Sequence, residues 1–214
     1  FKVEQTGRLV WKTLVTDVEF GFDGHAYISD WVNGWAMTGK GRIYRIANPN
    51  QTLSNAPSVQ ELFRKGFDKI NANALRNLLS HPDMRVRQAA QFQLVAKADT
   101  KSLGGIAWRG KGLARLHAVW GLGQLARGGQ NQDAALVPLL SDADGEVQTQ
   151  AAKMLGEARS ETAVPGLIEL LGSDNARAQV QAAIALSKIG GNYTDAVVAM
   201  LRRNDDADPI VRHG

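Results

Sequence analysis

The side chains that could bind a metal ion or transfer a proton are few in this 214-residue chain, and they are scattered. The four histidines are His25, His81, His117 and His213. No two of them stand at metal-ligand spacing, so packing or surface roles are favoured over ligation. The absence of cysteine excludes a disulfide, a thiolate metal site, a thiol nucleophile and covalent haem attachment within these residues. We therefore predict no metal site, no cofactor-binding residue and no catalytic residue in this chain.

Two groups near the N-terminus have the residue types of ion-binding loops. Asp17, Asp23 and Asp30 could be a calcium set or a general base, but their spacing follows no calcium loop, and Asp23 belongs to an Asp-Gly turn. The run TGKGR, residues 38–42, has the Gly and Lys of a phosphate-binding loop. It lacks the full spacing of that loop and opens a strand, so no helix N-terminus would face a phosphate. Structural roles are favoured for both groups.

The remaining candidate site is a set of polar residues that recur beside apolar stripes in the second half of the chain. The set is Arg87, Gln91, Arg115, Gln148, Gln181 and Lys188. If these residues share one concave face of a helical array, its polar and mildly basic character suits an acidic protein segment. A merely solvated face is the other interpretation, because no aromatic cluster is evident at its centre.

The elements that must position these residues change in kind along the chain. Short apolar runs at residues 14–20, 26–32 and 41–46 predict three strands within residues 1–50, with Asp23-Gly24 as a tight hairpin turn. Residues 51–58 are polar and carry a proline, which predicts a linker. Residues 59–214 have the apolar spacing of helices. We therefore expect a small β segment followed by a helical region.

The helical region contains an internal repeat. Its signature is Asp/Asn-x-x-apolar-Arg/Gln-x-x-Ala-x-x-x-Leu, with a degenerate second copy, and the Ala stands at positions 90, 118, 151 and 182. Each copy predicts two helices with one apolar stripe apiece, and a lone pair cannot bury its own stripe. The copies must therefore stack. The predicted fold class is mainly α, a right-handed α-solenoid of about four helical hairpins and a truncated fifth, with an N-terminal antiparallel β segment.

The repeat also makes local predictions. At least seven helices should follow residue 59, and Asp144 should cap one of them. Four glycines within residues 103–112 predict a short or frayed helix there, since each costs about 1 kcal/mol in a helix interior. We expect the strands to fold back on the first helices around Leu62, Phe63 and Phe67 and to cap the array. The leucines expected in the core are Leu79, Leu94, Leu122, Leu140, Leu155, Leu171 and Leu186.

The repeat pattern resembles that of the HEAT family, and longer runs extend the resemblance. GFDKINANALRNLLSHPDMRVRQAAQFQL (residues 66–94) and ARLHAVWGLGQLAR (114–127) are similar to the start of the helical region in large membrane-bound dehydrogenase-like proteins of planctomycetes and verrucomicrobia. TDVEFGFDGHAYISDWVNGW (16–35) and GKGRIYRI (39–46) are similar to the end of the β-propeller that precedes that region. The resemblance covers nearly the whole chain. With Phe1 in place of an initiator methionine, we expect a piece of a larger protein.

The resemblance implies a parent that is exported to the periplasm. Its propeller is similar to quinoprotein sugar dehydrogenases, its HEAT array follows, and a cytochrome c module with a Cys-x-x-Cys-His motif comes last. The implied cofactors of the parent are pyrroloquinoline quinone and haem c, and this chain carries neither the full propeller nor that motif. In a propeller remnant Trp31 and Trp35 are expected in the core between blades, although exposed indoles could stack on a sugar or a quinone.

Two functional hypotheses follow for this chain, and neither is an enzyme. The first is a non-catalytic HEAT spacer that links the propeller to the cytochrome module of the parent. The alternative is a free-standing HEAT module that binds proteins. Protein partners are expected in both, as neighbouring domains or as an acidic segment. A net charge of +4 is too mild for a protein that coats nucleic acid, and the absence of an 18-residue apolar run predicts no membrane insertion.

Overall fold

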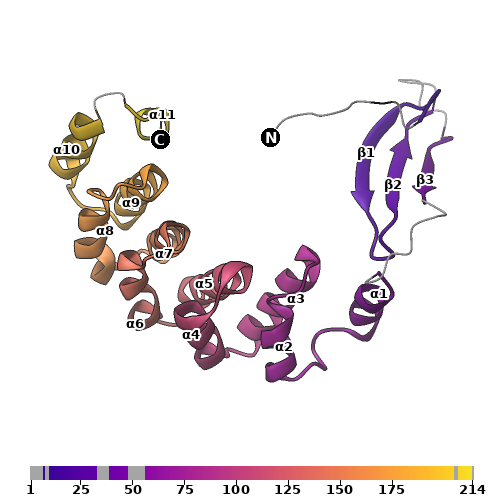
Figure 1. Cartoon of the computed structure of the whole chain (residues 1–214), viewed down its shortest axis with the longest axis horizontal. Helices are drawn as coiled ribbons and strands as arrows, with labels where there is room; N and C mark the ends of the chain where they lie inside the picture. Colours follow the sequence, from indigo (N-terminus) through magenta and orange to yellow (C-terminus); the bar gives the residue numbers. More distant parts are fainter. Residues whose placement is uncertain (1–6, 8–9, 33–38, 48–55, 205–206, 214) are drawn as a thin grey trace. The chain divides into compact units, whose positions relative to one another are not determined.

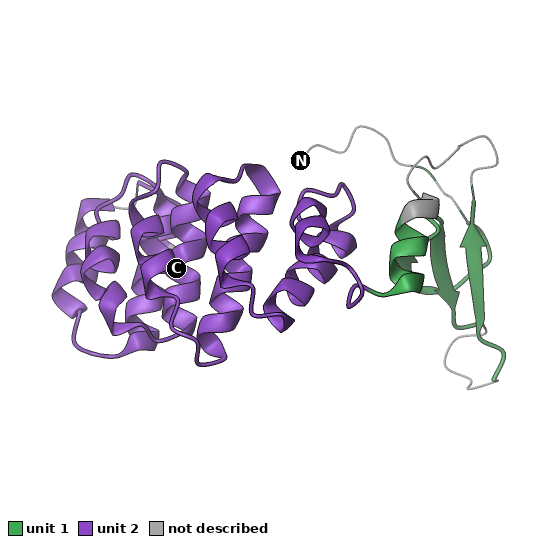
Figure 2. Cartoon of the chain, turned by 90° about the horizontal axis from the view of Figure 1, so that it is seen from below, with its two compact units in different colours: residues 1–66 green, residues 67–214 purple. Residues whose placement is uncertain are grey.

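The computed structural model describes residues 7, 10–32, 39–47, 56–204 and 207–213 (Figure 1). The chain forms two compact units, residues 1–66 and residues 67–214 (Figure 2). Trp35 and residues 51–55 of the predicted linker lie outside the described residues. The fold class is mainly α with a small antiparallel sheet, as the repeat and the strand pattern predict.

The first unit contains the predicted strands. β1 (Val15–Phe20), β2 (Ala26–Asp30) and β3 (Arg42–Ile46) form an antiparallel sheet in the order β1-β2-β3. The first hairpin differs from the prediction, because residues 21–25 form a five-residue loop and not a tight two-residue turn. Gly21 N donates to His25 O at 2.9 Å, and Asp23 Oδ1 accepts from His25 N at 3.2 Å. Asp23 is therefore a loop residue, as expected.

A helix completes the first unit. In α1 (Ala56–Lys65) the ring of Phe63 stacks on Phe22, with ring centroids 4.0 Å apart. Of the expected contacts of the strand region, the one with Phe63 is thus present, through Phe22 in the loop between β1 and β2. Because α1 belongs with the sheet, the boundary between units follows residue 66 and not the predicted linker. Capping of the helical array stays a prediction. Trp31 is 44% exposed in this chain, and its expected position between propeller blades stays a prediction.

The second unit is a series of helical pairs (Figure 1). The pairs are α2 (Ala72–Leu78) with α3 (Met84–Ala96), α4 (Thr100–Arg109) with α5 (Gly112–Arg127), α6 (Asp133–Leu136) and the 3₁₀ helix η1 (Val137–Ser141) with α7 (Gly145–Glu157), η2 (Glu161–Ala163) and α8 (Val164–Leu170) with α9 (Ala176–Ile189), and α10 (Thr194–Asn204) with α11 (Pro209–His213). The described residues after 59 contain no strand, and the predicted minimum of seven helices is exceeded. In the truncated fifth copy the second helix, α11, forms with five residues, although the sequence ends too early for a helix to be expected there.

The repeat signature specifies where the second helix of a pair begins. Asp83, Asp144 and Asn175 are the N-caps of α3, α7 and α9, and each side chain accepts a hydrogen bond from the backbone N–H two residues ahead. For Asp144 the distance to Glu146 N is 2.9 Å. The prediction of this cap is confirmed. Each cap satisfies one of the helix N–H groups that lack an intrahelical partner.

The core of this unit lies between the two helices of each pair and between neighbouring pairs. All seven leucines expected in the core are buried, with at most 3% of each residue exposed. α3, α5, α7 and α9 contact one another in sequence and line the inner side of the curve of this unit (Figure 1). Small residues allow neighbouring second helices to pack closely. A Cβ on Gly156 of α7, for example, would stand 2.6 Å from Ala185 Cα of α9.

One local expectation is wrong. α4 is a regular ten-residue helix, although the glycine content of residues 103–112 predicts a short or frayed one. Only Gly104 and Gly105 lie in its interior, because Gly110 is the C-cap and Gly112 begins α5. Full burial of Leu103 and Ala107 offsets the propensity cost, since tertiary packing supplies most helix stability in proteins.

Candidate functional site

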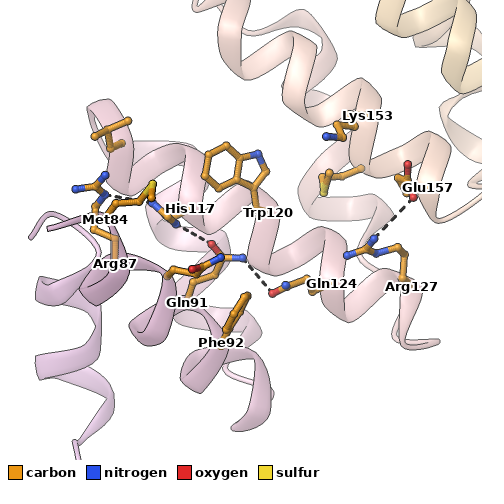
Figure 3. A pocket seen from close by; sticks show the side chains of 13 residues that line it. Met84, Arg87, Gln91, Phe92, His117, Trp120, Gln124, Arg127, Lys153 and Glu157 are labelled. Carbon is orange, nitrogen blue, oxygen red and sulfur yellow. Dashed lines mark hydrogen bonds and ion pairs between the residues drawn. The ribbon is translucent and has the colours of Figure 1, made fainter. Parts of the chain in front are cut away.

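The inner side of the second unit has a cleft of about 580 Å³ between three second helices (Figure 3). Its walls are helical stripes at spacings of three and four residues. The lining residues are Met84, Arg87, Gln88, Gln91 and Phe92 of α3, Leu113, His117, Trp120, Gln124 and Arg127 of α5, and Lys153, Met154 and Glu157 of α7. We refer to this cleft as the inner groove.

A directed chain of hydrogen bonds joins α3 to α5 at the floor of the inner groove. The buried Arg87 Nε donates to His117 Nε2 at 3.2 Å, and His117 Nδ1 lies 2.7 Å from Gln91 Oε1. Gln91 Nε2 donates to Gln124 Oε1 at 3.1 Å. Because the guanidinium can only donate, Nε2 of His117 must accept, and its proton is on Nδ1. The order of donation is therefore fixed from Arg87 through to Gln124 (Figure 3).

His117 is held in its neutral form. Burial is the main cause that lowers its pKa, and the positive charge of Arg87 lowers it further, to about 4. A proton on Nε2 would remove the hydrogen bond from Arg87 and place two cations in contact. The ring also packs edge-on against Trp120, with centroids 4.9 Å apart. A neutral His117 thus supports the aromatic wall of the groove.

A second chain of hydrogen bonds orients Trp120. Its indole N–H donates to Gln150 Oε1 at 2.8 Å, and Gln150 Nε2 donates to Glu146 Oε1 at 2.8 Å. Arg177 Nη1 of α9 donates to the other carboxylate oxygen of Glu146 at 2.7 Å. The indole is therefore held by a chain of hydrogen bonds that runs through Gln150 and Glu146 of α7 to Arg177 of α9. A half-buried aromatic ring with a fixed orientation is suited to contact a ligand.

The far end of the groove is basic. Glu157 pairs with Lys188 of α9 and with Arg127 of α5, the latter at 3.7 Å, and Lys153 stands one turn before it on α7. The hydrogen bond from Lys188 is the main cause that lowers the pKa of Glu157, and the charges of Arg127 and Lys153 contribute. Three cations thus surround one carboxylate. This corner has two positive charges in excess.

The repeating Arg/Gln of the signature has a structural role in three copies. Its side chain donates back to the backbone carbonyl six residues earlier, in the turn between the two helices of a pair. The acceptors are the carbonyl of His81 for Arg87, that of Asp142 for Gln148 and that of Ser173 for Gln179. These side chains close the turns of their own repeats.

Arg115 occupies the same position in the degenerate copy and joins two repeats. Its Nε donates to Ala107 O at 2.7 Å. Its Nη1 donates at 3.0 Å to Oδ1 of Asp142, which lies in the turn between the two helices of the next pair. Burial alone would raise the pKa of Asp142, but the hydrogen bonds from Arg115 and from Asp144 N outweigh it and lower this pKa. This ion pair is 14% and 15% exposed, so it is largely shielded from solvent.

The structure divides the polar set expected from the sequence. Arg87 and Gln91 line the inner groove, Arg115 and Gln148 hold the turns, and Gln181 and Lys188 lie on α9. Contact of these six residues with a partner stays a prediction. Sequence reasoning missed the apolar wall, which consists of the exposed Met84, Phe92 and Leu113 and the half-buried Trp120. A signal for it was present, because Phe92 and Trp120 both stand two residues after the repeat alanine, at Ala90 and Ala118.

The other candidate residues belong to the first unit. Asp30 accepts hydrogen bonds from Leu14 N and Val32 N, and Asp23 accepts one from the Tyr27 hydroxyl. Residues 39–41 lead into β3, and position 38 lies outside the described residues. Within the described part of the chain, no group of three or more His, Asp or Glu side chains could hold a metal ion. In the same part, no helix combines the length and the apolarity that crossing a membrane requires.

The shifted pKa of His117 predicts a pH dependence of stability. In the unfolded chain the imidazole takes up a proton near pH 6.5, whereas in the folded chain it does so near pH 4. Between these values the unfolded state binds more protons, so stability falls as the pH falls. From pH 7 to 4.5 the free energy of unfolding of residues 67–214 should decrease by about 2 kcal/mol.

Urea titrations at pH 7, 6, 5 and 4.5 check this dependence. His117→Gln should flatten it, because an amide can replace the imidazole without titrating. A His25→Gln control in the first unit should keep the wild-type slope. An unchanged slope in His117→Gln would show that another group is responsible.

Comparison with known proteins agrees with the repeat. Residues 133–214 match the family model of HEAT repeats. No curated protein matches the chain. A solved structure of an engineered protein is similar, at 22% identity and a TM-score of 0.44, over 66% of this chain and 74% of that one. The helical pairs make the second unit an α-solenoid of HEAT-like hairpins, and its last 82 residues match the family model.

Proposed function

We propose that residues 67–214 form a non-catalytic scaffold that holds an acidic protein segment in the inner groove. The supporting observation is the groove itself, which has exposed apolar side chains at one end and surplus positive charge at the other. Exposed apolar residues that gather in a concavity are typical of a binding surface. The absence of cysteine fits a scaffold better than an electron carrier with covalently bound haem.

The charge of the inner face supports an acidic partner. Its stripes on α3, α5, α7 and α9 carry five positive side chains against two negative ones, and these are Arg87, Arg127, Lys153, Arg177 and Lys188 against Glu146 and Glu157. A positive concave surface attracts an acidic segment and accelerates its encounter. The same field disfavours basic segments. HEAT repeats typically mediate protein interactions, and the family match over residues 133–214 agrees with this role.

The proposal extends to the setting of this scaffold. We place it in a larger exported protein, between a propeller similar to quinoprotein sugar dehydrogenases and a cytochrome c module, with the neighbouring domains as partners. The meander β1-β2-β3 directly before the helices supports this placement, because a propeller blade is an antiparallel sheet. Pyrroloquinoline quinone and haem c would belong to the other parts of that protein, and the periplasm would be its location.

The setting can be tested at the level of the gene. Coding sequence for further blades before Phe1 and for a Cys-x-x-Cys-His motif after Gly214 is the expected result. If both flanks lack these features, the spacer proposal is wrong and the alternative of a free-standing protein-binding module holds.

The binding face can be tested with a photocrosslinking residue in the full chain. Benzoylphenylalanine in place of Phe92 should form an adduct in cells, and mass spectrometry should map it to an acidic segment. The matched control replaces Trp108 of α4, which is equally exposed at 49% against 48% for Phe92 but lies on a first helix. The same adduct from both positions, or an adduct from Trp108 alone, would contradict the proposal.

A further inference from the structure

The apolar end of the inner groove is built around a rigid anchor point. Trp120 is fixed by the hydrogen bond to Gln150 and by the ring of His117, and it stands among the exposed side chains of Met84, Phe92 and Leu113. A ring that is already oriented loses little conformational entropy when a ligand side chain packs on it. Such positions are where a single aromatic or large aliphatic side chain contributes most to binding.

The basic end offers a different contact. Lys153 is exposed, and the side chains of Arg127 and Lys188 are 46% and 43% exposed while they share Glu157. A partner carboxylate can approach these cations without the cost of burying a charge. Contacts of this kind raise the association rate and depend on salt.

The distance between the two ends follows from helix geometry. Trp120 and Arg127 are seven residues apart on the same face of α5, with Gln124 between them. At a rise of about 1.5 Å per residue, two turns span roughly 10 Å. An extended segment advances about 3.3 Å per residue and covers this span in about three residues. The groove therefore matches a short two-part pattern.

We propose that the inner groove recognises an extended segment in which one aromatic or large aliphatic side chain packs on Trp120 and a pair of carboxylates about three residues away contacts Arg127 and Lys153. This inference rests on the proposed function, and it specifies the segment. An acidic run without the anchor, or an anchor with carboxylates immediately beside it, fits only one end of the groove. Affinity thus depends on spacing as well as on charge.

Synthetic peptides test this pattern by fluorescence anisotropy with the full chain at 50 mM salt. The reference peptide has one Phe and a Glu pair that begins three residues away. It is made in two versions, with the pair on the N-terminal or on the C-terminal side of Phe. A second peptide has Ser in place of Phe, and a third has the Glu pair directly beside Phe. We expect one of the two versions of the reference peptide to bind about tenfold more tightly than the second and third peptides.

Protein variants assign each contact. Phe92→Ser should weaken only the peptides that carry Phe, by about fivefold, and Lys153→Glu should weaken every acidic peptide about tenfold. Lys101→Glu and Trp108→Ala are the matched controls on α4, and they should leave the affinities unchanged. Phe92, Lys153 and both control residues are exposed, so all four variants should fold.

The outcomes separate the two proposals. Equal binding of all three peptides, with sensitivity to Lys153→Glu, would overturn the two-part pattern and leave the acidic scaffold in place. No binding of any acidic peptide would overturn both. A loss of binding in Lys101→Glu equal to that in Lys153→Glu would show a general charge effect and would also overturn the inference.

Discussion

Replacement of Arg115 by methionine is expected to reduce the free energy of unfolding of residues 67–214 by about 3 kcal/mol. The guanidinium of Arg115 pairs with Asp142 and also donates to the carbonyl of Ala107. Methionine keeps much of the side-chain volume but supplies no donor. The carboxylate of Asp142 would then stay largely buried without its cation, which is the costly part of such a change. Urea denaturation at pH 7 measures the loss.

A matched control is the pair between Arg177 and Glu146 in the same unit. Its side chains are 58% and 34% exposed, so Arg177→Met should cost less than about 1 kcal/mol. The two variants remove the same charge and the same number of donors. If both lose equal stability, the role given to the Arg115 pair in joining two repeats is wrong.

Gly156→Ala should destabilise the same unit by about 2 to 3 kcal/mol. The added Cβ would stand 2.6 Å from Ala185 Cα and 2.7 Å from Ala185 Cβ, which is closer than van der Waals contact permits. Because the obstacle is backbone and a methyl group, α7 and α9 would have to move apart. The melting temperature should fall by roughly 5 to 10 °C. Differential scanning calorimetry provides the measurement.

Gly104→Ala is the matched control for this glycine. Its Cβ would meet no atom within 4 Å, and the residue lies in the interior of α4. Alanine has the higher helix propensity, so this variant should gain up to about 1 kcal/mol. Opposite signs for the two substitutions are the expected result. A Gly156→Ala variant that melts at or above the wild-type temperature would contradict the close approach of α7 and α9.

The fold was largely predictable from the sequence, because each repeat contains the core and capping residues that define its helices. The alanines at 90, 118, 151 and 182 are fully buried, and the capping residues Asp144 and Asn175 begin their helices as the signature indicates. The length of α4 was not predictable from glycine content, since the burial of Leu103 outweighs intrinsic propensity. The five-residue loop at Asp23-Gly24 depends on backbone hydrogen bonds that the residue pair alone does not specify.

The candidate site was less predictable, for a physical reason. Arg87 and Gln148 recur in the signature because every turn needs a donor, so recurrence indicated structure more than binding. Phe92 and Trp120 stand two residues after Ala90 and Ala118, at the same position of two copies, and they share a groove because α3 and α5 pack side by side. That arrangement depends on contacts between repeats. The hydrogen-bond chain through His117 depends on the same contacts.

Hydrogen exchange of the full chain, with and without the two-part acidic peptide, tests most directly that the inner face is the binding face. Peptide binding should slow exchange in α3, α5 and α7, whose stripes form the groove, and should leave α2, α4 and α8 unchanged. The protection should disappear in Lys153→Glu and persist in Lys101→Glu. Protection of α2, α4 and α8 in place of the second helices, or none in α3, α5 and α7 at saturating peptide, would contradict the account.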